Sequence, residues 1–503
     1  MTPSIDPVTE AKELLRQRRS EDALAVIEPV ARVAGASHSE LHVYAGVLKR
    51  LGRIDDAIEV RRRAVRDFPA SAVAEHNLAA DLGDVESWEE SEVACRRAFE
   101  KGGAEPETWQ VLGRSLMNQK RLDEAEAALR EAIARRPTFG DAHRDLAQLI
   151  WMRSGDRDAA TALLRQAHEA HPGDAGLIML FSKAQQYGGR LDEAYETVRK
   201  AIASRAEPDF NLEMMASQLA IMSGQPGAAL EYVTRALRLK PRDLNAGISG
   251  CDAYLGLGQP DRAAELALRL RQIAPLEQQV VARLATAWRL MGDPRYRTLY
   301  DYDNLVRPYV IDTPSGWADL TAYLSDLAAA LKRLHAFETH PFDQSLRGGS
   351  QTSQDLGRVK EPAVRAFFQA IDGPIRRYME EVGPGEDVLR QRNTHEYHLN
   401  GSWSVMLRPN GFHIDHTHPS GWLSSACYIE LPEAVEKEGR EGWIKFGEPG
   451  IPTKPKAPAE HYVRPSPGLL VLFPSYMWHG TVPFSGNRNR LTVAFDVIPR
   501  PVS

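Results

Sequence analysis

The chain has 503 residues, more than one hydrophobic core ordinarily serves, so we expect two or three domains. Hydrophobic residues make up 43% of the sequence and charged residues 26%, which is the balance of a soluble globular protein. The formal net charge of -6 gives no electrostatic reason to expect nucleic acid or an anionic membrane as a partner.

The sequence lacks the usual signals for export or membrane insertion. Met1–Glu10 contains neither a basic segment nor an apolar one, so we expect no signal peptide, and no apolar run is long enough to span a membrane. Cys95, Cys251 and Cys427 lie far apart and form no Cys-x-x-Cys pair, which argues against a disulfide framework or a cysteine zinc site. These features predict a cytoplasmic protein.

The first 275 residues repeat with a period of 34 or 35 residues. A small residue follows a short turn signal once in each period, at Ala23, Ala57, Ser91, Ala125, Ala159, Ala194, Ala228 and Ala263. Prolines keep the same spacing, at Pro69, Pro137, Pro172, Pro241 and Pro275. Each unit is predicted to be a helix, a tight turn and a second helix. The small residue lets the two helices approach closely, and the proline ends the second one.

A single helical hairpin cannot bury its own apolar face, so neighbouring hairpins are expected to stack into a solenoid with a concave surface. The pattern resembles the tetratricopeptide repeat, with about eight units between roughly Val8 and Leu276. The resemblance implies that the concave groove binds a peptide or protein. A role as a spacer or dimerisation face is the alternative.

The segment 277–338 loses the regular spacing but keeps a helical pattern. Trp317–Leu334 shows the 3.6-residue period of an amphipathic helix, and turns that contain proline interrupt the segment before it. We predict a helical linker or capping region here. A polar loop at Thr339–Thr352 and another helix at Glu361–Glu381 are expected to follow.

After Arg390 the hydrophobic period becomes two, which is typical of strands. Four segments show this period, at Ser402–Arg408, Leu423–Leu431, Gly468–Phe473 and Arg490–Val497. Short strands separated by turn residues favour an antiparallel sandwich or distorted barrel. Alternation along the last strand places Arg490, Thr492, Ala494 and Asp496 on one face and its large apolar residues on the other.

Side chains that commonly bind metals cluster in 411–422, which reads Gly-Phe-His-Ile-Asp-His-Thr-His-Pro-Ser-Gly-Trp. On a strand, residues two apart point to the same side, so the first histidine and the aspartate, His413 and Asp415, face one way. His416 and His418 face the other way. Both pairs cannot bind one metal unless a bulge intervenes.

Residues from roughly 340 to 500 resemble the iron(II)/2-oxoglutarate-dependent oxygenases. The resemblance is to a bacterial and phage-type branch with the pattern His-x-His-Pro-Ser-Gly-Trp-Leu-Ser, which stands here at His416–Ser424. It implies a double-stranded β-helix, or jelly roll, with supporting helices, whose core covers about 395–500. It also implies Fe(II), 2-oxoglutarate as co-substrate, and O2.

In this superfamily the ligands are a His-x-Asp or His-x-Glu pair and a distal histidine. Because the register to the following strand matches the branch, we predict His416, His418 and His479 as metal ligands. His418 stands where the superfamily has a carboxylate, so water or a swung-in Asp415 is the alternative for that ligand. His413 and Asp415 are the alternative pair. No base or nucleophile is expected beyond the metal centre, because the metal carries the chemistry.

The co-substrate is predicted to bind beside the metal, since such iron sites leave positions open for 2-oxoglutarate and O2. Arg490 stands on a face of small and polar residues and suits bidentate pairing with the far carboxylate of 2-oxoglutarate. Thr492 and Tyr428 are candidates for additional contacts. Arg488 lies in a turn, where we expect it to be solvated.

Together these observations predict a multidomain α + β protein. An all-α tetratricopeptide solenoid occupies 1–276, a helical linker 277–338 and an oxygenase domain 339–503. The predicted function is hydroxylation of a peptide or protein recruited by the repeats, and the resemblance implies conversion of 2-oxoglutarate to succinate and CO2. Two alternatives remain. One is an interaction scaffold with an inactive barrel, and the other is a three-histidine iron dioxygenase that uses no 2-oxoglutarate and has no need of Arg490.

Overall fold

The computed structural model describes residues 6–342 and 344–500. Residues 1–5, part of the segment in which no signal peptide is expected, lie outside the described residues, as do 501–503 and residue 343 of the predicted loop. The chain divides into two compact units after Leu149. Among the described residues, every helix is too short or too polar to cross a bilayer. The predicted boundaries near 276 and 338 stay predictions.

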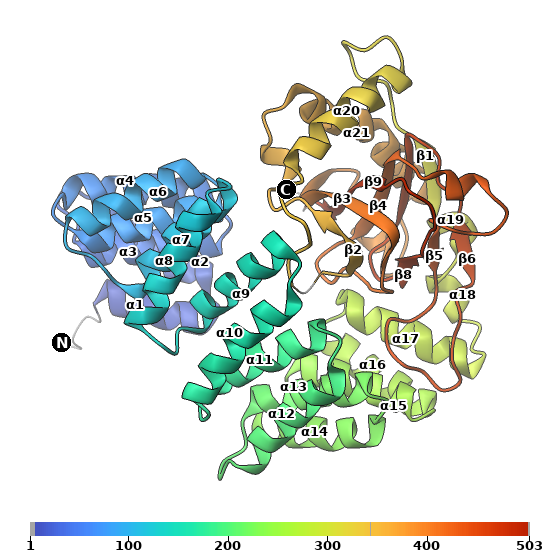
Figure 1. Cartoon of the computed structure of the whole chain (residues 1–503), viewed down its shortest axis with the longest axis horizontal. Coiled ribbons are helices and arrows are strands. Elements are labelled where there is room, and N and C mark those ends of the chain that lie inside the picture. The colour runs from blue at the N-terminus through green and yellow to red at the C-terminus, as the bar shows by residue number, and fades with distance from the viewer. Residues whose placement is uncertain (1–5, 343, 501–503) are drawn as a thin grey trace. The chain divides into compact units, whose positions relative to one another are not determined.

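The first unit consists of paired antiparallel helices, drawn in blue and blue-green in Figure 1. In chain order its helices are α1 (Pro7–Arg16), α2 (Ser20–Ala31), α3 (His38–Arg50), α4 (Ile54–Asp67), α5 (Ala72–Asp84), α6 (Trp88–Glu100), α7 (Pro106–Asn118), α8 (Leu122–Arg135) and the start of α9 (Gly140–Ser154).

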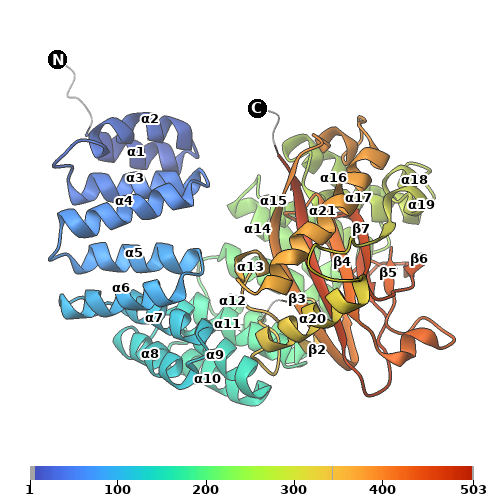
Figure 2. The ribbon, with the colours of Figure 1, turned by 90° about the horizontal axis from the view of Figure 1, so that it is seen from above.

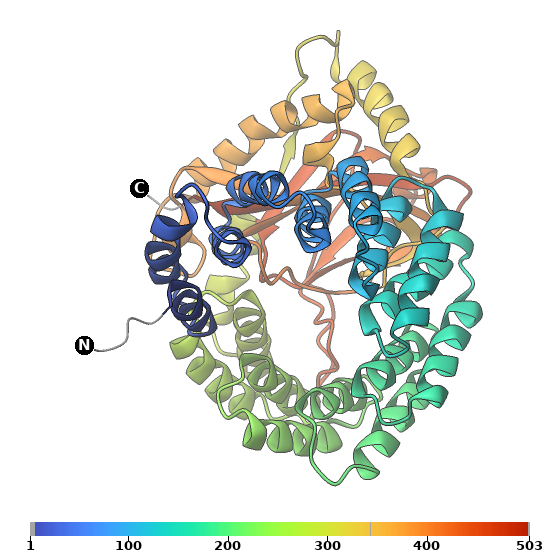
Figure 3. The ribbon, with the colours of Figure 1, turned by 90° about the vertical axis from the view of Figure 1, so that its left-hand side faces the viewer.

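The second unit begins with further helices of the same kind. They are α10 (Arg157–Ala170), α11 (Ala175–Tyr187), α12 (Leu191–Ala203), α13 (Phe210–Met222), α14 (Pro226–Leu239), α15 (Leu244–Gly256), α16 (Pro260–Ile273) and α17 (Gln278–Met291). Figure 3 shows α10 to α17 following one another as an arc. Helices α1 to α16 therefore form eight successive pairs along the described residues.

The repeat register is set by one small buried residue in each pair, always the fourth residue of the second helix. These residues are Ala23, Ala57, Ser91, Ala125, Ala160, Ala194, Ala229 and Ala263. The prediction of Ala159 and Ala228 is wrong by one position. Both precede another alanine, and the sequence pattern alone does not distinguish the two neighbours.

The predicted role of the prolines is confirmed. Pro69, Pro137, Pro172, Pro241 and Pro275 each lie two residues after the last residue of the second helix in a pair. A proline at this point cannot continue the helix, so it fixes where these five pairs end.

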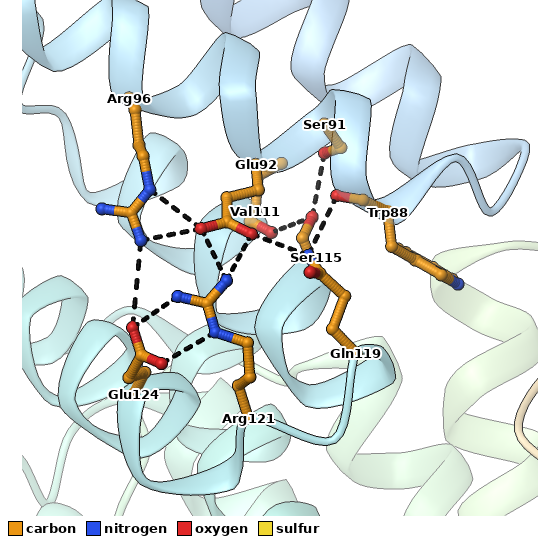
Figure 4. A network of polar contacts seen from close by, with 9 residues as sticks. All are labelled: Trp88, Ser91, Glu92, Arg96, Val111, Ser115, Gln119, Arg121 and Glu124. Atoms are coloured by element: carbon orange, nitrogen blue, oxygen red, sulfur yellow. Dashed lines mark hydrogen bonds and ion pairs between the residues drawn. The ribbon is translucent and has the colours of Figure 1, made fainter.

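Ser91 is the one repeat position that lacks alanine, and Figure 4 shows the contact between its hydroxyl and that of Ser115. Ser91 Oγ donates to the carbonyl of Ala79 at 2.7 Å and accepts from Ser115 Oγ at 2.9 Å. The neighbouring Glu92 accepts from Arg121 Nη1 at 2.7 Å, and this ion pair links α6 to the start of α8. A small polar residue is therefore tolerated here because every hydrogen-bonding group finds a partner.

After α17 the second unit changes to mixed structure. Its elements are α18 (Tyr296–Leu299), α19 (Tyr302–Leu305), β1 (Arg307–Val310), α20 (Leu320–Leu334), β2 (Leu346–Gln351), η1 (Leu356–Arg358), α21 (Pro362–Val382), η2 (Arg390–Arg392), β3 (Tyr397–His413), β4 (Leu423–Glu430), η3 (Glu433–Glu436), β5 (Ile444–Phe446), β6 (His461–Val463), β7 (Leu469–Pro474), β8 (His479–Thr481) and β9 (Arg490–Pro499).

Two segments differ from the sequence prediction. The predicted loop at 339–352 contains β2, which pairs with β3, and the predicted helical linker contains β1, which pairs with β7. Both are edge strands, one with two adjacent glycines and one with a proline. Such residues weaken the usual strand signal, and edge positions tolerate them.

The strands form two antiparallel sheets, as the predicted jelly roll requires, and the expected fold class is confirmed. The larger sheet has the order β1-β7-β4-β9-β3-β2 and the smaller one β6-β5-β8. Helices α20 and α21 lie along one face of the larger sheet (Figure 2), where Phe367 of α21 contacts Phe495 of β9. The opposite face of the larger sheet is not covered by these two helices.

Repeats and barrel share one hydrophobic core within the second unit. The core runs without a break from Ile248 of α15 to Val497 of β9. Trp478 Nε1 donates to Thr286 Oγ1 of α17 at 3.0 Å, and Tyr300 donates to the carbonyl of Tyr476 at 3.0 Å. The last repeats and the barrel are therefore held in a fixed relation.

The corrected register predicts opposite outcomes for two adjacent substitutions. Ala160 is 2% exposed against the neighbouring helix, so Ala160→Val should overpack the pair and lower the free energy of unfolding by about 1–3 kcal/mol. Ala159→Val, the matched control on the exposed side, should change it by less than about 0.5 kcal/mol. Equilibrium urea unfolding of both variants measures the difference, and equal losses would refute the register.

Candidate metal centre and its cavity

Three histidines converge on the open side of the barrel. His416 and His418 lie in the segment after β3, and His479 begins β8. Their ligand atoms all lie within 4.8 Å of one another, and the Nε2 atoms of His416 and His418 are 3.2 Å apart. Two backbone hydrogen bonds between His416 and His479, at 2.9 and 3.1 Å, hold the two segments together.

Each of the three imidazoles is oriented by a hydrogen bond from its Nδ1 atom. His416 donates to the carbonyl of Ile414 at 2.8 Å and His479 to that of Met477 at 2.9 Å. His418 donates to Asp496 Oδ1 at 2.7 Å. With the proton held on Nδ1, the lone pair of each Nε2 is free to bind a metal ion.

Burial keeps two of these histidines neutral. It lowers the pKa of His416 to about 3, with His418 adding to the shift, and lowers the pKa of His479 well below its usual value. A metal ion binds the neutral imidazole, so no proton has to be displaced from these two ligands at neutral pH.

The alternative pair lies close by but outside the converging group: His413 lines the same cavity, with its ring centre 6.0 Å from that of His416. His413 is the last residue of β3, and its Nδ1 is 2.9 Å from Ser345 Oγ. Asp415 accepts from Lys445 Nζ at 2.8 Å, and Lys445 also pairs with Glu448. Neither His413 nor Asp415 joins the group of converging ligand atoms found among the described residues.

Arg490 is a buried cation without a counter-charge. Its side chain is 2% exposed, its guanidinium lies 5.0 Å from the centre of the Tyr428 ring, and its Nε has no hydrogen-bond partner. Among the described residues, no carboxylate lies within ion-pair distance of it, and burial lowers its pKa. Arg488 is exposed, as expected, and lies 3.8 Å from Glu433. A buried, unpaired guanidinium is costly, so an anion would be stabilised beside it.

Thr492 and Tyr428 lie opposite each other on neighbouring strands, close to Arg490. Thr492 lines the cavity, and its hydroxyl donates to the carbonyl of Val405 at 3.4 Å. Tyr428 is fully buried, and its side chain lies against the Arg490 guanidinium. Both predicted co-substrate residues therefore neighbour the buried cation.

The alternation along β9 follows the sequence prediction. Leu491, Val493, Phe495 and Val497 belong to the core, whereas Arg490, Thr492, Ala494 and Asp496 line the cavity. Asp496 was not predicted as a site residue. The signal was present, because it shares the strand face of Arg490. Its carboxylate accepts from His418 and, at 2.8 Å, from Ser424 Oγ.

A cavity of about 980 Å³ lies over this face, entirely within the second unit. The three histidines and Arg490 line one side of it. Residues of α11, α13, α15 and α17 line the other side, so repeat helices and barrel enclose the same space. This volume exceeds what one 2-oxo acid occupies, which leaves room for a second molecule.

Comparison with protein families identifies both parts of the chain. Residues 401–496 match a family described as "Putative 2OG-Fe(II) oxygenase", and this stretch contains all three converging histidines and Arg490. Residues 8–72 and 86–149 match families described as tetratricopeptide repeat. The chain therefore joins tetratricopeptide repeats to a 2OG-Fe(II) oxygenase domain. That family implies Fe(II), 2-oxoglutarate and O2, and the predicted resemblance is confirmed.

Individual relatives are more distant. The cytochrome c-type biogenesis protein CycH of Bradyrhizobium diazoefficiens is 26% identical over 292 residues, which cover 57% of this chain and 70% of that protein. Yeast Tom70 is 16% identical with a TM-score of 0.44, over 56% of this chain and 60% of that one. MamA from Desulfovibrio magneticus RS-1 is 18% identical with a TM-score of 0.30, over 34% of this chain and 98% of that one.

The donor set fits an iron(II) ion, because three imidazole nitrogens converge and a carboxylate supports one of them. Asp496→Asn keeps an acceptor for His418 but removes the negative charge. We expect Fe(II) affinity to fall about 10- to 100-fold, as is usual when such a supporting partner is lost. Anaerobic Fe(II) titration by calorimetry measures the affinity.

Glu433→Gln is the matched control, since Glu433 is an exposed acid outside the cavity. Its Fe(II) affinity should equal that of the unsubstituted chain. An unchanged affinity in Asp496→Asn would show that the carboxylate does not support the metal.

Proposed function

We propose that this chain is an Fe(II)- and 2-oxoglutarate-dependent dioxygenase that hydroxylates a peptide or protein segment held by its repeats. One observation carries the proposal. A single cavity contains the converging histidines, the unpaired Arg490 and the inner helices of the last repeats. The family match supports the oxygenase chemistry, and the choice of a peptide rests on the repeats.

In this proposal His416, His418 and His479 hold the iron through their Nε2 atoms. With iron bound, the reaction would consume O2 together with 2-oxoglutarate. One oxygen atom of O2 would enter succinate as 2-oxoglutarate loses CO2, and the other would enter the hydroxylated C–H bond of the substrate. The protein contributes no separate acid, base or nucleophile. Its residues fix geometry, charge and access.

Arg490 orients the co-substrate by pairing with its far carboxylate. Bidentate pairing would give the unsatisfied Nε and its neighbouring amino group partners and would neutralise the buried cation. Thr492 is placed to donate a hydrogen bond to the co-substrate. The ring of Tyr428 lies 5.0 Å from the Arg490 guanidinium and helps to hold it in position. These contacts fix the position of the co-substrate in the cavity.

Aromatic rings limit the access of water to the distal histidine. Phe473 lies with its ring centre 4.6 Å from that of His479, and Phe446 lies 6.4 Å from it. A dry surrounding strengthens every electrostatic contact inside the site. The side of His479 that these rings leave uncovered faces the cavity, whose other side is lined by the repeat helices.

The unpaired Arg490 separates this proposal from its two rivals. A three-histidine dioxygenase without a 2-oxo acid has no use for a buried cation at this position. A scaffold with an inactive barrel has no use for it either, nor for the oriented histidines. Both would retain the cost of an uncompensated guanidinium.

Anaerobic titration with Fe(II) and 2-oxoglutarate tests the co-substrate directly, through the weak visible charge-transfer band of the chelate. Arg490→Ala should lose the band at moderate 2-oxoglutarate while Fe(II) affinity stays unchanged. Removing one side of a buried charged pair costs about 3–5 kcal/mol, so the dissociation constant for 2-oxoglutarate should rise by about a hundredfold or more.

Arg488→Ala is the matched control and should behave as the unsubstituted chain, because Arg488 is exposed. If iron binds without any band, the three-histidine alternative replaces the proposal. If no iron binds, the scaffold alternative replaces it.

The choice of ligand pair gives a second test. His416→Ala should abolish Fe(II) binding, whereas Asp415→Asn should leave it within a fewfold, because Asp415 is engaged by Lys445. Calorimetric Fe(II) titration of both variants, with circular dichroism to verify folding, decides the matter. Loss of binding in Asp415→Asn alone would assign the metal to His413 and Asp415.

A further inference from the structure

Amide side chains recur at one position of three successive repeat helices. Asn211, Asn245 and Gln279 are each the second residue of their helix, in α13, α15 and α17, and are spaced by 34 residues. All three line the cavity that contains the histidines. The second residue of α11 is Gly176, which has no side chain to offer, so the series starts at α13.

These three amides have no structural task in their own helices. The preceding acids Asp209, Asp243 and Glu277 cap the helices by accepting from backbone N–H groups. The amide side chains make no hydrogen bond to another described residue, and Asn211 and Asn245 are exposed to the cavity. They are available to a ligand.

A primary amide both donates and accepts hydrogen bonds, which matches the N–H and C=O groups of a peptide main chain. Packed helices lie about 8–10 Å apart, and an extended chain rises about 3.3 Å per residue. Neighbouring amides of the series would therefore meet an extended peptide about once every three residues. Main-chain contacts of this kind do not depend on which side chains the peptide carries.

The surface around the amides is rich in methionine. Four of the chain's 11 methionines, Met179, Met214, Met215 and Met222, line this one cavity. Methionine is unbranched and polarisable, so such a surface adjusts to side chains of different shape. The amides and methionines together suit a ligand that is polar along its main chain and apolar in its side chains.

The two charged residues with which α13, α15 and α17 line the cavity are paired with each other, whereas Lys183 of α11 and Arg347 of β2 line other parts of it. Arg283 of α17 donates to Asp252 of α15 at 2.8 and 3.1 Å, and both are buried. The pair leaves no free carboxylate on the wall to attract a basic segment. The wall therefore favours an uncharged segment.

The last helix of the series is fixed relative to the metal site. The guanidinium of Arg283 lies 4.9 Å from the ring centre of Trp478, whose Nε1 donates to Thr286 of the same helix. Trp478 directly precedes His479. A peptide bound by the amides is thus held at a set position relative to the three histidines.

We propose that Asn211, Asn245 and Gln279 bind the main chain of an extended, uncharged peptide segment across α13, α15 and α17. The methionines take its apolar side chains, and one residue of the segment reaches the metal. The oxidation of that residue rests on the proposed function. Binding of the segment does not require iron.

The probe is a degenerate pool of peptides of about twelve residues, enough to reach all three amides, built without Asp, Glu, Lys or Arg. A second pool includes those four residues. The metal-free full-length chain is used to enrich each pool, and mass spectrometry identifies the retained peptides. The uncharged pool should be enriched and the charged pool depleted. Retention of no peptide, or preference for charged ones, would overturn the proposal.

One retained peptide, labelled for fluorescence anisotropy, then tests the residues. Each lost amide should raise its dissociation constant about fivefold, and the triple variant Asn211→Ala/Asn245→Ala/Gln279→Ala on the order of a hundredfold. The control triple Gln272→Ala/Gln391→Ala/Asn400→Ala removes exposed amides outside the cavity and should stay within about twofold. Equal effects of the two triples would refute the role of the amides.

N-methylation of the peptide, one residue at a time, tests main-chain recognition. Affinity should fall at positions spaced by about three residues, because each methyl removes one N–H donor. Losses at every position, or at none, would contradict the proposed spacing.

Titration of the same amide variants with Fe(II) and 2-oxoglutarate separates the two proposals. The amide triple should keep the visible band, because its residues lie away from the histidines on the opposite wall. An absent band in the unsubstituted chain refutes the proposed function but leaves the binding result valid. A normal band with no peptide bound refutes only the inference about the amides.

Discussion

Two backbone hydrogen bonds between His416 and His479 set the arrangement on which the site depends. They join the segment after β3 to the start of β8, although 63 residues separate the two histidines in the chain. With the backbones fixed, the Nδ1 hydrogen bonds decide where each Nε2 points. The convergence of the three imidazoles is thus set by the backbone pairing of the fold.

The segment that carries His479 also connects the site to the repeats. Trp478, next to His479, donates to Thr286 and lies under Arg283, so α17 packs directly behind the ligand-bearing segment. A shift of the last repeat would therefore move His479. One hydrophobic core includes both the last repeat helices and the strands of the barrel. The histidine site and the repeat wall opposite it are therefore packed together rather than joined by a hinge.

Charge balance shows how the proposed site, which has no carboxylate ligand, would suit the oxygenase chemistry proposed above. In the proposed complex, Fe(II) contributes two positive charges, 2-oxoglutarate two negative ones and Arg490 one positive one. Asp496 contributes the remaining negative charge. It accepts a hydrogen bond from the proposed ligand His418 and does not itself bind the metal. The sum is zero, as it would be with a directly bound carboxylate. A buried site tolerates such a set because each charge has a partner.

The sequence predicted those features that depend on repetition and alternation. The repeat period, the prolines and the two faces of β9 each follow from a regular pattern, and Arg490 was found because it stands on such a face. The choice between the two ligand pairs depended instead on where β3 ends, which is fixed by its pairing with β2. The glycine-rich β2 gave no strand signal. The amides at 211, 245 and 279 were also missed, because their meaning appears only when the cavity places them opposite the histidines.

In the two proposals, peptide binding and oxidation rest on different kinds of residue within one cavity. The histidines, Asp496 and Arg490 belong to barrel segments whose backbone pairing leaves little freedom. The amides and methionines belong to helix surfaces, where the caps and the buried alanines maintain the helix whatever side chain faces the cavity. The repeat wall can therefore set which segment is bound without disturbing the metal site, since the two are coupled through the core and not through shared ligands.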